Sequence, residues 1–345
     1  MPGVEFNCLP TIIGSMPHTD PGVACSQIAH YLRDIPAWPQ LPRRSFLENM
    51  YVQYSQGFPG VMVNEAEKKI YVNRNQDLDQ PLEQLYSAFL ENRSDEFAIS
   101  ADYAAGLYRF LALDNLAPKA VKGHVTGPVT WGLTVADEDG KGILYDDVLG
   151  DAVPKLLRLK ATWQERELKQ ICRRTIIFVD EPYMSAFGSV GMMLSKEKVV
   201  SLLNEVFGGI EGLKGVHCCG NTDWSVILGS DVDIISFDAY NYAQSLSLYP
   251  EDVKRFLERG GTVAWGIVPN EEEALKRESA ASLKDRLEEA IAPFTRNGVS
   301  FRQLIAQGLV TPSCGLASLA SEEAAVRVLE LLAELSLSIR RRYGM

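Results

Sequence analysis

Short apolar runs rich in β-branched residues alternate along this chain with longer segments in which apolar positions recur at helical spacing. The runs predict strands, which we place at residues 11–14, 119–125, 175–180, 213–217, 233–237, 262–267 and 309–311. The longer segments predict helices at residues 20–34, 81–92, 95–112, 148–174, 195–208, 250–258, 283–295 and 320–341. This alternation indicates a parallel sheet, and 345 residues suit an α/β fold of the (β/α)8 TIM-barrel type.

Polar or reactive residues stand at the C-terminal ends of the predicted strands, namely Ser15, His124, Asp180, His217, Asp238 and Cys314. In a barrel these ends converge on one mouth, where barrel enzymes carry their active sites. Residues 36–75 break the alternation, because they are rich in proline and aromatic residues and carry hairpin signals. We interpret them as an insertion after the first strand that covers the mouth. Without a linker or repeat, residues 1–345 are predicted to form a single domain.

Charge and composition exclude several classes of protein. The net charge is −11 and the chain has no long Lys/Arg-rich run, so nucleic-acid binding is not expected. No apolar run is long enough for a membrane span, and the first residues do not resemble a signal peptide. Six cysteines are too few for a disulfide scaffold, which favours a reducing cytoplasm. No helix opens with a nucleotide-binding glycine motif.

The candidate metal ligands are His217, Cys219 and Cys314. Side chains alternate along a strand, so His217 and Cys219 point to the same side and Cys218 points away. A histidine and two thiolates form a ligand set suited to zinc, and Asp238, at the end of the next strand, is a candidate fourth ligand. A zinc site with an open position can bind a substrate thiol and hold it as a thiolate. The alternative is a buried histidine among buried cysteines.

Four further features are less specific. The Asp180–Glu181 carboxylates at a strand end could hold a cation, act in acid–base chemistry or cap a helix. The Gly14–Ser15 turn could hold a carboxylate through its backbone N–H groups, or be a plain loop. His124 is a candidate catalytic residue with a structural role as the alternative, and Glu65 is read by default as surface charge.

Taken together, these residues resemble the superfamily of cobalamin-independent methionine synthase and uroporphyrinogen decarboxylase, which includes methylcobalamin:coenzyme M methyltransferases. The resemblance covers residues 9–335, and its motifs are Pro10–Pro17, Asn64–Glu67, Gly123–Thr130, Val179–Pro182, His217–Gly220, Ile235–Asp238 and Ser313–Gly315. The chain is about half the size of a full methionine synthase, so it looks like the catalytic barrel of such an enzyme alone.

The resemblance implies a zinc-bearing barrel with His217, Cys219 and Cys314 as ligands. The family's fourth ligand is a glutamate, and Asp238 stands in its place as a shorter ligand. By the same resemblance, Glu65 and Asp180 hold the amino group of homocysteine. Its carboxylate lies near Gly14 and Ser15, and its sulfur binds zinc.

One departure from the family bears on the methyl donor. Folate-dependent members place a histidine after the sixth strand, which helps protonate the departing tetrahydrofolate. Residues 263–269 contain no histidine here. Cob(I)alamin leaves without a proton, so we expect a methylcorrinoid donor, either free or on a corrinoid protein.

The first functional hypothesis is therefore methyl transfer from a methylcorrinoid to homocysteine, giving methionine. The runner-up acceptor is coenzyme M or another thiol, although its sulfonate would leave the carboxylates of Glu65 and Asp180 without an amine partner. Uroporphyrinogen decarboxylation has no use for a zinc-ligand triad. A non-enzymatic metal or corrinoid carrier is the remaining alternative, and the chain lacks an Asp-x-His-x-x-Gly corrinoid motif.

Overall fold

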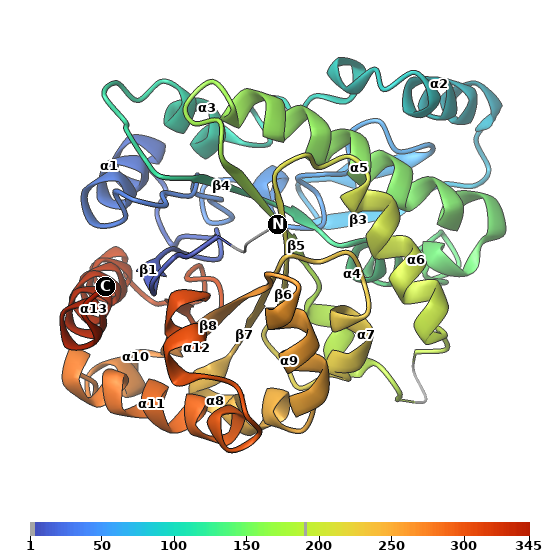
Figure 1. Cartoon of the computed structure of the whole chain (residues 1–345). Coiled ribbons are helices and arrows are strands. Elements are labelled where there is room, and N and C mark those ends of the chain that lie inside the picture. The colour runs from blue at the N-terminus through green and yellow to red at the C-terminus, as the bar shows by residue number, and fades with distance from the viewer. Residues whose placement is uncertain (1–3, 190–191) are drawn as a thin grey trace.

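A computed structural model describes residues 4–189 and 192–345. Its strands form one curled parallel sheet and one antiparallel hairpin, with helices surrounding the sheet (Figure 1). The strands are β1 (Leu9–Pro10), β2 (Val61–Asn64), β3 (Lys69–Val72), β4 (Val121–Thr126), β5 (Thr175–Asp180), β6 (Leu213–Cys218), β7 (Ile234–Phe237), β8 (Thr262–Val268) and β9 (Gly308–Pro312). The seven-stranded sheet has the order β1-β9-β8-β7-β6-β5-β4, and every pair in it is parallel.

Residues 36–40 close the gap between the two edges of this sheet. The backbone N–H of Trp38 donates to the carbonyl of Lys122 on β4, and the N–H of Gln40 donates to the carbonyl of Gly14 after β1. Isolated parallel bridges join Ala37 to Lys122 and Ser15 to Gln40. The α/β barrel expected from the sequence is thus confirmed, with an irregular segment in place of an eighth regular strand.

The helices alternate with the strands and pack on the outside of the sheet (Figure 1). They are α1 (Pro21–Tyr31), α2 (Asp79–Leu90), α3 (Ala105–Leu111), α4 (Pro128–Thr134), α5 (Asp147–Leu168), α6 (Lys196–Phe207), α7 (Trp224–Leu228), α8 (Ala239–Ser247), α9 (Pro250–Glu258), α10 (Glu272–Leu275), α11 (Ala280–Arg296), α12 (Phe301–Ala306) and α13 (Glu322–Tyr343). Several helices begin at a residue whose side chain accepts hydrogen bonds from backbone N–H groups of the first turn. These residues are Asp20 for α1, Asp146 for α5 and Ser321 for α13.

Several sequence predictions differ from these elements. The helices predicted at 20–34 and 148–174 end earlier, at Tyr31 and Leu168. The predicted strand at 11–14 is not a regular strand, since β1 ends at Pro10 and Gly14 lies in a bend. The predicted helix at 95–112 divides into a 3₁₀ turn (Ser94–Phe97) and α3, because residues 98–104 take non-helical turns between them.

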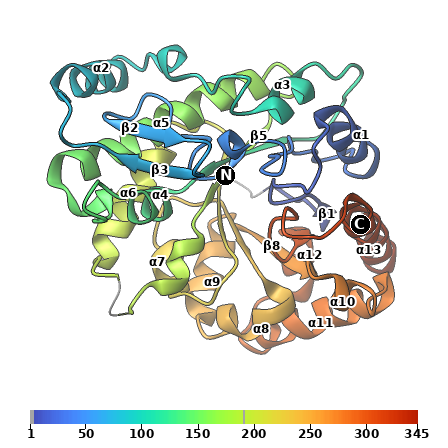
Figure 2. The ribbon, with the colours of Figure 1, turned by 180° about the vertical axis from the view of Figure 1, so that it is seen from behind.

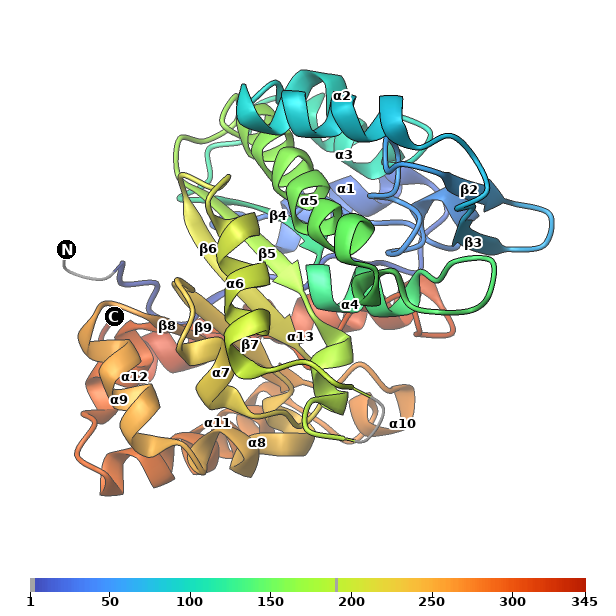
Figure 3. The ribbon, with the colours of Figure 1, turned by 90° about the vertical axis from the view of Figure 1, so that its right-hand side faces the viewer.

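The predicted insertion at 36–75 also divides. Its first five residues belong to the barrel wall, whereas β2 and β3 form the expected hairpin, with Val61 opposite Val72. Between them, the hydroxyl of Tyr54 donates to the carbonyl of His124, and the hydroxyl of Thr126 donates to the carbonyl of Met50. In side view the hairpin lies at the opposite end of the barrel from the N-terminus, as Figure 3 shows, and Figure 2 views the hairpin end. Residues 50–72 therefore lie toward the mouth end of the barrel, and their role as a lid stays a prediction.

The lower half of the barrel interior is apolar. Nine residues that point inward or close the N-terminal end form one buried cluster: Phe6, Leu9, Ile35, Ala120, Ile176, Phe178, Ile234, Ala264 and Leu309. A second and larger cluster fills the space between the sheet and the helices. Burial of apolar surface in these layers stabilises the barrel and leaves its upper interior for polar side chains.

Lys160 on α5 is a fully buried cation outside the barrel, and its ammonium donates to the carbonyl of Ala98 at 3.3 Å. Burial lowers the pKa of this lysine from 10.5 to about 7. The unfolded chain therefore binds more protons than the folded chain between these two pH values, and stability rises with pH there.

Replacing Lys160 with methionine is expected to raise the free energy of unfolding by on the order of 2 kcal/mol below pH 7. The gain shrinks above pH 7 and disappears near pH 10.5, where the unfolded lysine is also neutral. Denaturant unfolding at pH 6, 8 and 10 measures this trend. A K160M gain that does not change with pH contradicts the assignment.

Among residues 4–189 and 192–345, no helix combines the length and apolar character needed to cross a bilayer.

Candidate metal and substrate site

The C-terminal ends of the parallel strands carry a group of buried polar atoms without protein partners. In the described part of the chain these include both ring nitrogens of His124, Oδ1 of Asp180, Nε2 of His217 and Oγ1 of Thr311. Unsatisfied buried polar groups are rare in folded proteins, and their gathering at one end of a barrel marks a place for a ligand or metal.

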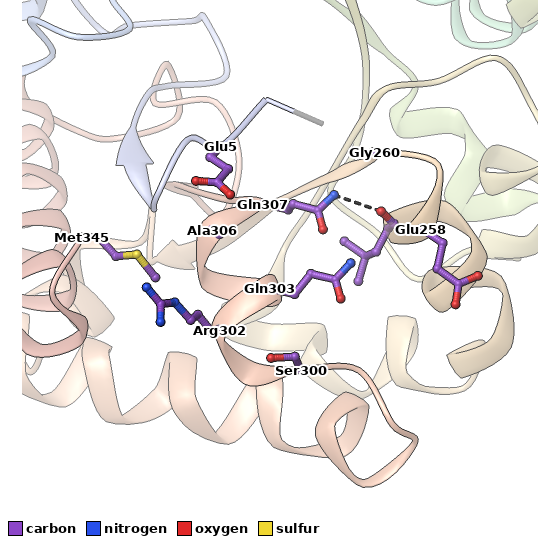
Figure 4. A pocket seen from close by; sticks show the side chains of 10 residues that line it. Glu5, Glu258, Gly260, Ser300, Arg302, Gln303, Ala306, Gln307 and Met345 are labelled. Carbon is purple, nitrogen blue, oxygen red and sulfur yellow. Dashed lines mark hydrogen bonds between the residues drawn. The ribbon is translucent and has the colours of Figure 1, made fainter. Parts of the chain in front are cut away.

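A separate cavity of about 440 Å³ lies at the other end of the barrel (Figure 4). It is lined by residues that precede β1, β8 and β9, among them Glu5, Gly260 and Gln307. The amide of Gln307 donates to the carbonyls of Leu257 and Gly261, so its polar atoms serve the local backbone. Barrel enzymes carry their chemistry at the opposite face, and we therefore place the functional site at the mouth.

Three of the four predicted metal ligands come together there. The ligand atoms of His217, Cys219 and Cys314 all lie within 4.8 Å of one another. Donor atoms around a tetrahedral zinc ion lie about 3.3–3.8 Å apart, so small side-chain movements bring all three into contact with one ion. His217 is buried and the two cysteines are half-buried, and Cys218 points away into the larger core cluster. This arrangement fits a zinc ion.

The two neighbouring cysteines differ in acidity. The proximity of Cys314 lowers the pKa of Cys219 to about 4, with His217 adding to the effect, whereas burial opposes it. Cys219 and burial raise the pKa of Cys314 far above its usual range. Cys219 is therefore the more acidic of the two, and binding a metal to both sulfurs requires both thiols to lose their protons.

Ser236 on β7 orients the imidazole of His217. Its hydroxyl lies 3.0 Å from Nδ1, and these two residues are in register between β6 and β7. This contact leaves Nε2 buried and without a partner in the described residues. A histidine that binds a metal through one ring nitrogen typically has a hydrogen-bond partner on the other nitrogen, and Ser236 is that partner here.

Asp238 is not part of the group of three. Its carboxylate caps α8 instead: Oδ1 accepts from the backbone N–H of Asn241, and Oδ2 accepts from that residue's side-chain amide. Burial raises the pKa of this carboxyl, and the bonds from Asn241 oppose the rise. Its role as a fourth ligand stays a prediction, since the carboxylate would have to exchange Asn241 for a metal.

The neighbouring carboxylates Asp180 and Glu181 have different roles. Glu181 is fully buried and accepts hydrogen bonds from the backbone N–H groups of Val129 and Thr130, so it caps the start of α4. For Glu181 this is the helix-capping role, one of the three considered for the carboxylate pair. Asp180 is in register with Thr126 on β4 and with His217 on β6, and its Oδ1 has no partner in the described residues. Burial raises the pKa of Asp180 to about 6, whereas Lys122 and His217 oppose the rise. Asp180 is the carboxylate available to a ligand.

The Gly14–Ser15 turn lies beside Cys314. A Cβ atom added to Gly315 would come within 2.2 Å of the Ser15 hydroxyl, and the backbone N–H of Leu316 donates to the Ser15 carbonyl at 2.8 Å. A Cβ on Gly14 would lie 2.6 Å from the His124 ring. Glycine at position 14 thus lets the turn approach the barrel interior closely.

His124 is buried against this turn. Its ring stacks on Trp38 with centroids 4.1 Å apart, and burial holds its pKa well below the usual value, with Lys122 adding to the effect. Its ring is therefore neutral, and both ring nitrogens are buried without a hydrogen-bond partner in the described residues. The structure brings His124 to the site, and its catalytic role stays a prediction.

Glu65 is not brought into the cluster. It lies in the turn between β2 and β3 and is exposed. The pKa of the Tyr103 phenol is raised mainly by burial and to a smaller extent by the negative charge of Glu65.

Two residues of the site, Ser236 and Lys122, do not stand out in the sequence. Lys122 lies two residues before His124 on β4, and Ser236 lies opposite His217 in the neighbouring strand and two residues before Asp238. Counting the two-residue strand period back from His124 and from Asp238 would have identified both as candidates.

Comparison with known proteins supports the fold. No protein-family model matches the chain, and a search of curated proteins finds no match. Among solved structures, a B12-independent methionine synthase from Shewanella sp. W3-18-1 in complex with selenomethionine aligns with a TM-score of 0.59 at 14% identity. The alignment covers 97% of this chain and 98% of that one. A methyltransferase from Methanosarcina mazei aligns with a TM-score of 0.54 at 13% identity, over 100% of this chain and 94% of that one.

At these identities the two alignments establish a shared barrel fold over the whole chain. They do not transfer a reaction, because one barrel fold supports many chemistries.

Proposed function

We propose that this protein is a zinc-dependent methyltransferase that moves a methyl group from a methylcorrinoid to homocysteine, forming methionine. The observation that carries the proposal is the convergence of His217, Cys219 and Cys314 within 4.8 Å at the barrel mouth. The barrel neighbours support only the methyl-transfer part of the proposal, since one is a B12-independent methionine synthase and the other is a methyltransferase. The corrinoid donor is proposed from the lack of a histidine in residues 263–269.

His217 Nε2 and the sulfurs of Cys219 and Cys314 would hold the zinc, with Asp238 as the predicted fourth ligand. Bound Zn²⁺ supplies a Lewis acid that lowers the pKa of a coordinated thiol and keeps it as the nucleophilic thiolate. Ser236 holds the ring of His217, and the core packing of Cys218 fixes the strand end that carries Cys219.

The remaining residues would orient the acceptor. Asp180, beside His217, offers a buried carboxylate oxygen to the amino group of homocysteine. The Gly14–Ser15 turn, beside Cys314, offers backbone N–H groups to its carboxylate. With both ends held, the sulfur is directed toward the metal ligands, which reduces the entropic cost of reaction.

With a methylcorrinoid donor, the leaving group would need no proton. The homocysteine thiol would lose its proton to solvent on binding to zinc, and its thiolate sulfur would form an S–C bond to the methyl carbon as the Co–C bond breaks. The bonding electron pair would stay on cobalt, which would go from Co(III) to Co(I). A tetrahydrofolate leaving group needs an acid instead, and residues 263–269 contain no histidine to supply it.

The donor is tested with zinc-loaded protein and homocysteine, offering methylcobalamin in one assay and methyl-tetrahydrofolate in another. We expect loss of the Co–CH₃ absorption with methylcobalamin and no methionine with methyl-tetrahydrofolate. Turnover with methyl-tetrahydrofolate and none with methylcobalamin would exclude a corrinoid as the methyl donor.

Coenzyme M is the second candidate acceptor, because the His-x-Cys-Gly-Asn sequence at 217–221 resembles that branch of the superfamily. The unpaired Oδ1 of Asp180 favours homocysteine, since a sulfonate brings no amine to a buried carboxylate.

Replacing Glu65 with glutamine is expected to raise the KM for homocysteine by about three- to tenfold, with kcat changed by less than about twofold. The reason is a screened attraction between an exposed carboxylate and the acceptor's amine. Glu67→Gln is the matched control, because Glu67 lies in the same turn and pairs with Lys69. Steady-state kinetics measure both, and an unchanged KM in E65Q removes this role.

A further inference from the structure

Lys122 on β4 carries a positive charge in the barrel interior, directly below the site. It is fully buried, and its ammonium donates to the carbonyl of Ile13 at 2.5 Å. The same nitrogen lies 4.1 Å from the centre of the Phe178 ring, which belongs to the apolar lower layer of the barrel. The lysine therefore stands between that layer and the Gly14–Ser15 turn.

No carboxylate of the described residues forms a salt bridge with Lys122. Burial lowers the pKa of this lysine to about 8, and Asp180 opposes the fall, so the ammonium stays mainly protonated at pH 7. Asp180 is thus the nearby negative charge, but it lies beyond salt-bridge distance. A buried cation with no carboxylate in direct contact costs stability, and such costs are concentrated at functional sites. Its counter-charge can be supplied by a bound ligand.

The turn above Lys122 offers donors to such a ligand. All three of its carbonyls are engaged: Ile13 accepts from Lys122, Gly14 from the N–H of Gln40, and Ser15 from the N–H of Leu316. In contrast, the backbone N–H groups of Gly14 and Ser15 donate to no acceptor among residues 4–189 and 192–345. The peptide bond whose carbonyl accepts from the ammonium is the one that carries the Gly14 N–H, so the cation makes that N–H a stronger donor.

We propose that Lys122 is a positioning residue for acceptor recognition, which orders and polarises the Ile13–Ser15 turn so that it binds the carboxylate of an amino-acid acceptor. This inference rests on the proposed function. Lys122 acts through the turn and through its charge, and it does not touch the reacting sulfur.

The test measures methyl transfer from methylcobalamin to two thiols, homocysteine and 3-mercaptopropylamine, which is homocysteine without its carboxylate. In the unmodified protein, removal of the carboxylate is expected to lower kcat/KM by about 100-fold. In Lys122→Met, kcat/KM for homocysteine falls by about tenfold or more, mainly through KM, while that for 3-mercaptopropylamine changes by less than about threefold. The preference for the carboxylate thus shrinks.

Lys160→Met is the matched control. Lys160 is the same residue type, is equally buried and donates to a backbone carbonyl, but it lies on α5 outside the barrel. K160M is expected to keep the full preference for homocysteine. Thermal unfolding first confirms that each variant folds. If K122M does not fold, Lys122→Gln, which keeps an N–H donor but no charge, is expected to lose the same preference.

Equal losses for both thiols in K122M, or a full preference for homocysteine in K122Q, overturn the assignment of Lys122 and leave the proposed function standing. An unmodified, zinc-loaded protein that methylates neither thiol overturns both the assignment and the proposed function.

Discussion

Replacing Cys314 with serine is expected to remove bound zinc and methyl transfer together. Cys314 supplies one of only two sulfurs in the group formed with His217 and Cys219. A serine hydroxyl does not ionise near neutral pH and is a poor zinc ligand, so the site would keep two strong ligands and lose most of its affinity. We expect less than about 0.1 zinc per chain and a fall in kcat/KM of at least about 1,000-fold.

Cys218→Ala is the matched control for this experiment. Cys218 adjoins Cys219, but it is buried in the larger core cluster on the other side of β6 and its thiol donates to the carbonyl of Gly220. The variant is expected to lose some stability and to keep its zinc. Metal analysis after gel filtration gives the zinc content. A C314S protein that retains one zinc per chain would contradict the ligand assignment.

Replacing Asp180 with asparagine is expected to leave zinc in place and to lower kcat/KM for homocysteine by about 100-fold or more. The change preserves shape and removes the charge from a carboxylate whose Oδ1 has no partner in the described residues. A hydrogen bond between a buried carboxylate and an ammonium group is among the strong ones, so its loss mainly weakens acceptor binding. Kinetics over a range of homocysteine concentrations separate KM from kcat.

Glu181→Gln serves as the control for Asp180→Asn, because the two carboxylates are adjacent in the chain. Glu181 accepts from two backbone N–H groups at the start of α4, and glutamine keeps only one of the two acceptor oxygens. Loss of one of these two hydrogen bonds should lower the free energy of unfolding by about 1–2 kcal/mol and leave the KM for homocysteine unchanged. If D180N and E181Q have the same kinetics, Asp180 has no special place in acceptor binding.

Hydrophobic patterning predicted the barrel because its strands are short runs of β-branched residues. Residues 175–180 are such a run, and β5 has the same limits. The patterning missed the segment that closes the barrel, because residues 36–40 contain two prolines and no β-branched run after Ile35. Their place depends on hydrogen bonds to Gly14 and Lys122, which lie far away in the chain.

The site was predictable to the extent that residue type determines it. A histidine and two cysteines at strand ends led to the group of three that the structure contains. Asp238 shows the limit, because its preference for the N–H groups of Asn241 arises from where α8 begins. Lys122 was equally easy to overlook, because lysine within a strand is usually interpreted as outward-facing, although it lies two residues before His124 on the same strand.

The most direct test of the central claim is a single-turnover assay with zinc-loaded protein and methylcobalamin, comparing homocysteine with coenzyme M. The account predicts loss of the Co–CH₃ absorption with homocysteine, matched by an equal amount of methionine. It also predicts that removing the zinc abolishes this reaction and that adding the zinc back restores it. Turnover with coenzyme M alone, or methionine formation that does not depend on zinc, would contradict the account.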